Sequence, residues 1–227
     1  MARLIVGMTG ASGAGLGVRV LEALRELPDM ETHLVMSRWA RTTIELETPY
    51  TAAEVAKLAD VTYRPGDQAA AISSGSFQTD GMVIVPCSMK TVAAIRAGYA
   101  DTLVGRAADV VLKERRRLLL VPRETPLSEV HLDNLLALAR MGVGILPLMP
   151  AFYNNPTTID DILDHLVARV LDQFDLPAPR AHRWSGLADA RSPAAGCADD
   201  LSAATAAGAR PSSQPRPARR GSPNSTR

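Results

Sequence analysis

The sequence has few aromatic side chains, few cysteines and almost no excess of charge of either sign. Aromatic residues make up 4% of the 227 residues, too few for the base-stacking surfaces of single-strand-binding proteins. The 25 Lys and Arg residues nearly balance the 24 Asp and Glu residues, and a formal net charge of +1 favours neither nucleic acid nor a membrane surface as a partner. No apolar run approaches the roughly 18 residues that a membrane-spanning helix needs, and the first residues lack the pattern of a signal peptide.

The two cysteines, Cys87 and Cys197, lie in segments of different character and do not indicate a disulfide framework. Neither the cysteines nor the four histidines show the spacing of metal ligands. We therefore expect a soluble cytoplasmic protein without a metal site.

The composition changes near residue 185. Residues 185–227 are rich in Ala, Ser, Pro and Gly, and their only large aliphatic residues are Leu187 and Leu201. Such a segment buries too little apolar surface to offset its conformational entropy. We expect a folded domain over residues 1–184 and a disordered tail over residues 185–227.

Short apolar runs alternate with stretches of helical periodicity along the first 184 residues. The runs are residues 4–7, 32–36, 81–85, 117–121 and 143–146. Continuous apolar runs are typical of parallel strands that helices cover on both faces. The alternation predicts an α/β domain with a doubly wound parallel sheet, in which ligands bind beyond the carboxyl ends of the strands.

The loop after the first run, residues 8–17, is rich in glycine. Glycine lets a ligand approach the backbone, and the N-terminus of the following helix favours an anion. The loop is not a dinucleotide fingerprint, because Val18 replaces the last small residue, and it lacks the Gly-Lys-Ser/Thr of a Walker loop. Ser12, and Ser37 after the second run, are suited to a phosphate or a flavin ring edge; a tight turn with a helix cap is the alternative.

Polar residues also follow the third and fourth runs. We expect Ser88 to cap a helix, and Cys87 to be a small buried side chain, because no histidine lies near it in the sequence. After the fourth run, two prolines bracket Arg123 and Glu124. A surface ion pair does not normally need such a rigid frame.

Basic residues and one phenol are candidates for binding an anion. Arg106 and Lys113 are seven residues apart, so both can lie on one face of a helix. Together with Arg123 and Arg169 they would form an anion clamp if buried, although each alone is more often a surface residue. Tyr153 adds a hydroxyl in a proline-rich loop.

An aspartate run matches a known magnesium motif. Asp160, Asp161 and Asp164 have the D-D-x-x-D pattern by which prenyl diphosphate enzymes hold magnesium. We favour a helix start here, with Thr158 as the N-cap and Asp161 three residues further on.

Eight motifs, in this order, closely resemble the UbiX family of flavin prenyltransferases. They are residues 10–13 (GASG), 46–48 (LET), 73–77 (SSGSF), 86–91 (PCSMKT), 106–110 (RAADV), 112–116 (LKERR), 122–127 (PRETPL) and 150–153 (PAFY). The resemblance extends from about Arg3 to Trp184, and the PRETPL and PAFY motifs are its most specific part.

The resemblance implies a flavodoxin-like or Rossmann-like three-layer sandwich that assembles as a homo-oligomer, typically a dodecamer, with active sites at subunit junctions. It also implies the reaction, in which a dimethylallyl group passes from dimethylallyl monophosphate to N5 and then to C6 of reduced FMN, without a metal. The product, prenylated FMN, would serve UbiD-type decarboxylases, including those of ubiquinone biosynthesis.

The resemblance also implies site residues. Those for the flavin are Gly10, Ala11, Ser12, Ser37, Ser88, Met89, Lys90, Thr91 and Arg123. Tyr153 and Arg169 would hold the dimethylallyl phosphate. Lys113 and Arg106 would reach it from a neighbouring subunit. The groups that handle protons would be Ser12, Glu47 and Glu124, and Trp184 would form an aromatic wall.

Two other functions fit a related fold. An FMN-dependent cysteine decarboxylase would carry the substrate-clamp motif P-x-M-N-x-x-M-W, which the sequence lacks. A non-catalytic flavin-binding regulator would tolerate the loss of Glu47, Lys113 or Tyr153, and all three are present.

Overall fold

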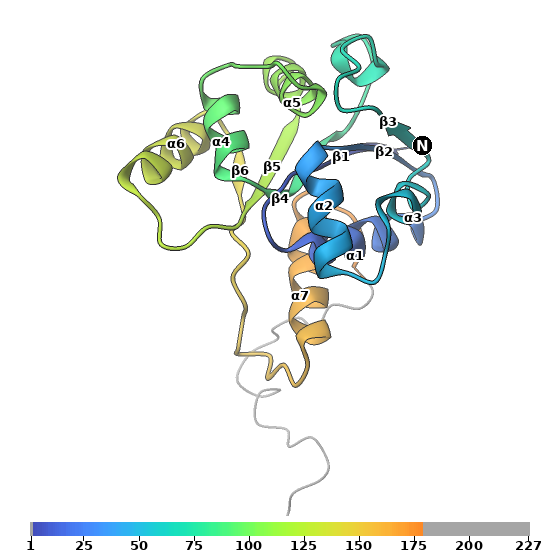
Figure 1. Cartoon of the computed structure of the whole chain (residues 1–227), viewed down its shortest axis with the longest axis vertical. Coiled ribbons are helices and arrows are strands. Elements are labelled where there is room, and N and C mark those ends of the chain that lie inside the picture. Colours follow the sequence, from blue (N-terminus) through green and yellow to red (C-terminus); the bar gives the residue numbers. More distant parts are fainter. Residues whose placement is uncertain (1, 179–227) are drawn as a thin grey trace, which may run out of the picture. The chain divides into compact units, whose positions relative to one another are not determined.

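A sheet of six parallel strands forms the centre of the computed structural model, which describes residues 2–178 (Figure 1). The strands are β1 (Ala2–Met8), β2 (Met30–Met36), β3 (Val61–Tyr63), β4 (Gly81–Cys87), β5 (Arg117–Pro122) and β6 (Gly144–Ile145). The helices are α1 (Ala14–Arg25), α2 (Arg38–Glu47), α3 (Ala52–Ala56), α4 (Met89–Arg96), α5 (Leu103–Lys113), α6 (Glu129–Arg140) and α7 (Ile159–Asp172). The predicted tail, residues 185–227, and the predicted wall residue Trp184 lie outside the described residues.

The strands place alternate side chains in two separate cores. On β1, Leu4 and Val6 contribute to one core and Ile5 to the other. Helices α1, α2, α3 and α7 close the first core, and α4, α5 and α6 close the second, on the opposite face of the sheet (Figure 1). Because successive side chains of a strand point to opposite faces, a sheet covered on both faces needs continuously apolar strands.

The strand order is β3-β2-β1-β4-β5-β6. All five predicted strands are present, and the doubly wound α/β fold is confirmed. When the five predicted strands are numbered in chain order, they lie across the sheet in the order 2-1-3-4-5, as in flavodoxin-like sheets. The sixth strand, β3, was not predicted, because it has only three residues and none of them is fully buried.

The chain changes direction across the sheet between β1 and β4. From β1 it winds outward to β2 and β3, whereas from β4 it winds the other way to β5 and β6. In such sheets the connections part at this point and leave a crevice beyond the carboxyl ends of the two strands. The loops that follow β1 and β4 therefore define the place where a ligand is expected.

Candidate active site

Thr9 joins the two loops at the crevice. Its hydroxyl donates to the carbonyl oxygen of Pro86 at 2.9 Å and accepts from the amide of Ser88 at 2.7 Å. Thr9 is buried and lies directly after β1, whereas Ser88 directly follows β4. Thr9 was not among the predicted site residues; its lone hydroxyl between a buried strand and a glycine-rich loop is the signal that points to it.

Two serines of the predicted flavin site cap helices beside this crevice. Ser37 accepts a hydrogen bond from the amide of Ala40 and so begins α2. Ser88 accepts one from the amide of Thr91 and begins α4, as expected, and its hydroxyl lies 3.0 Å from that of Thr91. Lys90 is exposed in the first turn of α4. The cap and the predicted flavin role are compatible, because a hydroxyl oxygen that accepts from the backbone still has its own proton to donate.

The N-terminus of α1 is occupied by a carboxylate of the chain itself. Oε2 of Glu47 accepts hydrogen bonds from the amides of Gly13 at 2.8 Å and Ala14 at 2.9 Å. Gly13 has a positive φ of 104° and no side chain with which to cap the helix, so Glu47, at the end of α2, supplies the cap. This helix end was predicted to favour an anion, and the anion that it binds in the structure is the carboxylate of Glu47.

Ser12 and Arg123 complete a cluster around Glu47. Burial raises the pKa of Glu47, but hydrogen bonds from the Ser12 side chain and from the amides of Ala14 and Gly13, together with the charge of Arg123, lower it below its ordinary value. Glu47 is therefore ionised at neutral pH. The structure thus brings together three predicted site residues from three parts of the chain: the loop after β1, the end of α2 and the loop after β5.

Glu124 and Cys87 lie near the same edge of the sheet but differ in exposure. Glu124 is exposed, and its Oε1 accepts from the amide of Thr125 at 3.1 Å. Cys87 is fully buried, and burial alone raises the pKa of its thiol far above the ordinary value. A thiol in this state is a packing side chain and not a nucleophile, as the sequence analysis expected.

Tyr153 and Arg169 are connected through His165. The Tyr153 hydroxyl lies 3.4 Å from Nε2 of His165, and the two rings meet edge to face with centroids 5.7 Å apart. His165 and Arg169 are one turn apart on α7 and both line a cavity of about 300 Å³ with Leu146 and Met149. His165 was not among the predicted site residues; its spacing of four from Arg169 is the signal that points to it.

The loop that carries Tyr153 also approaches the crevice. Leu148 packs against the glycine loop, because a Cβ on Gly13 would lie 2.6 Å from Cδ1 of Leu148. The amide of Leu148 donates to the carbonyl of Pro122 at the end of β5. Figure 1 shows the rest of this connection extending beside α7.

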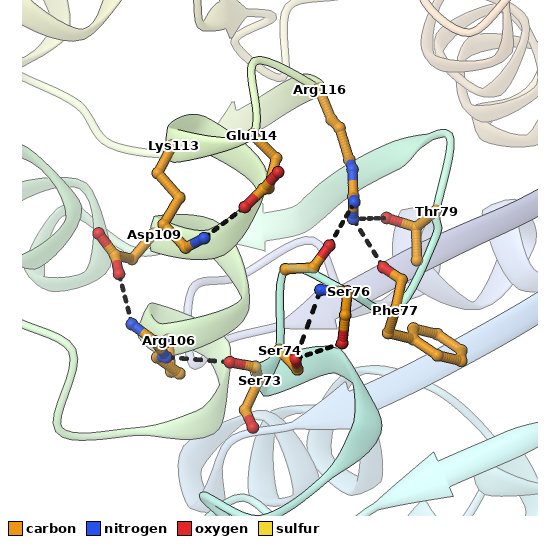
Figure 2. A network of polar contacts seen from close by, with 11 residues as sticks. Ser73, Ser74, Ser76, Phe77, Thr79, Arg106, Asp109, Lys113, Glu114 and Arg116 are labelled. Atoms are coloured by element: carbon orange, nitrogen blue, oxygen red, sulfur yellow. Dashed lines mark hydrogen bonds and ion pairs between the residues drawn. The ribbon is translucent and has the colours of Figure 1, made fainter.

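Arg106 and Lys113 lie elsewhere, in a network between α5 and residues 73–79 (Figure 2). Arg106 donates to the carbonyl of Ser73 at 3.1 Å and forms an ion pair with Asp109 at 2.8 Å, and Lys113 forms an ion pair with Glu114. Arg116 donates to the carbonyl oxygens of Gly75 and Phe77, both at 2.7 Å.

The four predicted clamp residues therefore do not share one face of the chain. Helix α5, with Arg106 and Lys113, covers the face of the sheet opposite to α7, with Arg169. Arg169 is also paired, with Asp172 at 2.8 Å. Arg106 and Lys113 can meet Tyr153 and Arg169 only across two copies of the chain. The family resemblance implies the same arrangement, with Arg106 and Lys113 supplied by a neighbouring subunit.

The aspartate run is a helix cap. Thr158 and Asp161 form a capping box, as expected, and hydrogen bonds from the backbone and hydroxyls of Thr157 and Thr158 lower the pKa of Asp161 to about 2. Asp160 and Asp164 both pair with Arg19.

The described residues, 2–178, contain neither a metal-binding cluster nor a membrane-spanning helix. No group of three or more His, Cys, Asp or Glu side chains in this range is arranged to hold a metal ion. None of the helices in it has the length and apolar character needed to cross a membrane.

The crevice fits a flavin mononucleotide. Among the helix ends there, that of α4 offers the amides of Met89 and Lys90, which have no hydrogen-bond partner among the described residues, beside the hydroxyls of Ser88 and Thr91. Such a helix end, with a lysine in its first turn, suits a phosphate. The glycine loop after β1 lacks side chains that would keep a flat ring away from the backbone.

Comparisons with known proteins agree on one family. The family model described as Flavoprotein matches residues 1–171. A probable UbiX-like flavin prenyltransferase of Streptomyces sp. (strain D7) is 73% identical over 192 residues, which cover 85% of this chain and 96% of the relative.

Two solved structures are also similar. The dodecameric FMN-dependent UbiX-like decarboxylase from Escherichia coli O157:H7 is 71% identical with a TM-score of 0.80, and the match covers 81% of this chain and all of that one. AnUbiX (PadA1), in complex with FMN and dimethylallyl pyrophosphate, is 56% identical with a TM-score of 0.80, and the match covers 82% of this chain and 98% of that one.

Proposed function

Because the chain belongs to the flavoprotein family, and within it to the UbiX-like flavin prenyltransferases, we propose that it joins a dimethylallyl group from dimethylallyl monophosphate to N5 and C6 of reduced FMN. The net change adds C5H8 to the flavin and releases inorganic phosphate. The bound flavin supplies the nucleophilic ring, and the chain's own residues bind, orient and move protons.

The observation that carries this proposal is the cluster of Ser12, Glu47 and Arg123 at the crevice. It combines an ionised carboxylate, a hydroxyl and a guanidinium at the position where the fold binds a ligand. Closing a fourth ring on the flavin requires removal of a proton from C6, and an ionised carboxylate is the group suited to accept it. We assign this step to Glu47, with Ser12 beside it, and a second proton-handling role to Glu124 at the end of β5.

Breaking the allylic C–O bond leaves a negative charge on the departing phosphate. Arg169 provides a guanidinium at the cavity that it lines with His165, and the Tyr153 hydroxyl lies beside the same histidine. Donors fixed in place stabilise such a charge more than water does, because they need no reorganisation. A monophosphate also carries less charge than a diphosphate, which allows side-chain cations to replace a metal ion.

Lys113 and Arg106 enter the proposal from a second copy of the chain. Both lie at the surface of α5, away from Tyr153 and Arg169 on the same chain. A homo-oligomer with sites between subunits, as a dodecamer would provide, brings the two sets together. Trp184, as an aromatic wall, and delivery of the product to a UbiD-type decarboxylase in the cytoplasm complete the proposal.

An anaerobic assay tests the reaction directly. Purified protein is incubated with reduced FMN and dimethylallyl monophosphate in the presence of a metal chelator, and the flavin is examined by mass spectrometry. We expect a flavin heavier by one C5H8 unit, together with one equivalent of inorganic phosphate. Unmodified flavin, with FMN demonstrably bound, would refute the transferase function.

A parallel reaction with dimethylallyl pyrophosphate identifies the donor. We expect the monophosphate to react faster, since a clamp of side-chain cations without a metal matches its smaller charge. Faster reaction of the pyrophosphate, or a need for magnesium, would contradict the proposed donor.

A further inference from the structure

Of the helices that begin at the crevice, α1 and α4 differ in what occupies their N-termini. At α4, Ser88 accepts from the amide of Thr91, and the amides of Met89 and Lys90 donate to no described residue. At α1, one oxygen of Glu47 accepts from the amides of both Gly13 and Ala14. One helix end is thus open to a ligand, and the other is filled by a carboxylate.

The carboxylate at α1 comes from outside the helix. The N-cap, Gly13, has no side chain, and the first turn of α1 contains no acidic residue. Glu47 is 34 positions further along the chain and is the last residue of α2. The amides of a helix N-terminus attract an anion, and here the fold brings one to them.

In sheets of this topology the end of the first helix has a common use. Where a glycine loop follows the first strand, the pyrophosphate of a dinucleotide binds at the N-terminus of the next helix. The order β3-β2-β1-β4-β5-β6 and the glycine loop of this chain reproduce that setting. Glu47 lies where the phosphate groups would be.

We propose that Glu47 determines the orientation of the flavin by keeping phosphate groups away from α1, so that the flavin phosphate binds at the N-terminus of α4. This role rests on the proposed function only in that the crevice holds the flavin. It is separate from proton transfer, because it needs the carboxylate as a fixed charge on two amides. Two anions cannot share this helix end, since both would need the same donors and would repel each other.

The position of an anion in a variant without Glu47 tests the proposal. Crystals of the wild-type protein, of Glu47→Ala and of Glu45→Ala are soaked with tungstate, whose anomalous scattering locates it. Glu45 is the matched control, because it lies on the same helix but accepts from Ala52 and not from α1. We expect tungstate within hydrogen-bond distance of the Gly13 and Ala14 amides in Glu47→Ala alone.

A solution measurement makes the test independent of crystals. Equilibrium dialysis with labelled inorganic phosphate is carried out on FMN-saturated protein, so that the α4 end is already occupied. We expect Glu47→Ala to bind phosphate about two- to fivefold more tightly than the wild type and Glu45→Ala, the size expected for an opened helix end. If Glu47→Ala does not fold, Glu47→Ser takes its place, because its short side chain also leaves the amides free.

Two results would overturn the proposal. One is the absence of tungstate from the α1 amides in both Glu47 variants, with unchanged phosphate affinity; the other is tungstate at those amides in the wild type. Failure of the wild type to bind FMN at all would instead count against the proposed function. The tungstate experiment needs no flavin, and so the two failures can be told apart.

Discussion

The amide of Ser88 donates a 2.7 Å hydrogen bond to the hydroxyl of Thr9, and the same hydroxyl donates to the carbonyl of Pro86. This contact fixes the start of α4, the proposed phosphate site, relative to the glycine loop after β1.

Replacing Thr9 with valine should weaken both the fold and flavin binding. The substitution keeps the shape but leaves the Ser88 amide without its acceptor, at a cost of about 1–3 kcal/mol in the free energy of unfolding, whereas the Pro86 carbonyl still accepts from the amide of residue 9. We expect a lower FMN affinity, because the N-terminus of α4 loses its anchor. Chemical denaturation and flavin fluorescence titration measure the two effects. Thr9→Ser, which keeps the hydroxyl, is the control; equal losses in both variants would show that the hydroxyl is not responsible.

Tyr153→Phe and Arg169→Ala should impair turnover while FMN still binds. Removing one donor from a developing charge costs roughly a factor of 10² to 10³ in rate. Both residues are linked to His165 and the cavity on α7, away from the proposed phosphate site at α4. Single-turnover rates and FMN titration measure the effects, with Tyr99→Phe, an exposed tyrosine elsewhere, as the control. Loss of FMN binding in the Tyr153 or Arg169 variant would contradict its assignment to the allyl phosphate.

Gly75→Ala should disturb Lys113 without changing the flavin site. A Cβ at residue 75 would lie 2.7 Å from Nζ of Lys113 and 2.2 Å from Oε1 of Glu114, so the ion pair must move. We expect the KM for dimethylallyl monophosphate to rise several-fold, with FMN affinity unchanged. Gly66→Ala is the matched control, because a Cβ there meets nothing within 4 Å. An unchanged KM in Gly75→Ala would remove Lys113 from the proposed clamp.

His33 should make the protein less stable as the pH falls below about 6.5. It is 2% exposed, and burial is the main cause that lowers the pKa of its imidazole, against the opposing charge of Glu31. The unfolded chain therefore takes up a proton at a higher pH than the folded chain, and stability decreases by at most about 1.4 kcal/mol per pH unit in this window.

Urea denaturation between pH 7.5 and pH 5.5 measures this slope. His33→Gln should flatten it, because glutamine does not titrate. The carboxylates with lowered pKa, such as Glu47, lose their contribution only below about pH 4.5 and do not interfere. The same slope in His33→Gln as in the wild type would rule out His33 as its source.

Cys87 should not react with thiol reagents in the folded protein. Its thiol is fully buried, and burial raises its pKa, so the reactive thiolate is scarce. A Cys197→Ser variant isolates this residue. We expect no labelling by a disulfide reagent until denaturant is added. Rapid labelling of the native variant would show that the Cys87 thiol is accessible and reactive.

The sequence predicted the sheet well because its signals are local. The continuous apolar runs mark five strands, and Thr158 with Asp161 marks the start of α7 within four residues. Strand β3 was not predicted, because a strand of three residues, of which Thr62 is exposed, is too short to show a periodic pattern.

The contacts of the site are harder to predict because they join distant parts of the chain. Glu47 meets Gly13 across 34 positions, and Thr9 meets Ser88 across 79. No local pattern links such residues. The assignment of Glu47 came from the family resemblance, whereas its position on the α1 amides came from the structure.

The cap that α1 receives from α2 couples the formation of the two helices. With no capping side chain of its own, the first turn of α1 unwinds readily whenever the end of α2 moves away, and hydrogen exchange at the Gly13 and Ala14 amides would then accelerate together. The capped conformation of the glycine loop therefore depends on Glu47. A fragment that ends before this residue would contain the whole loop and still lack its conformation.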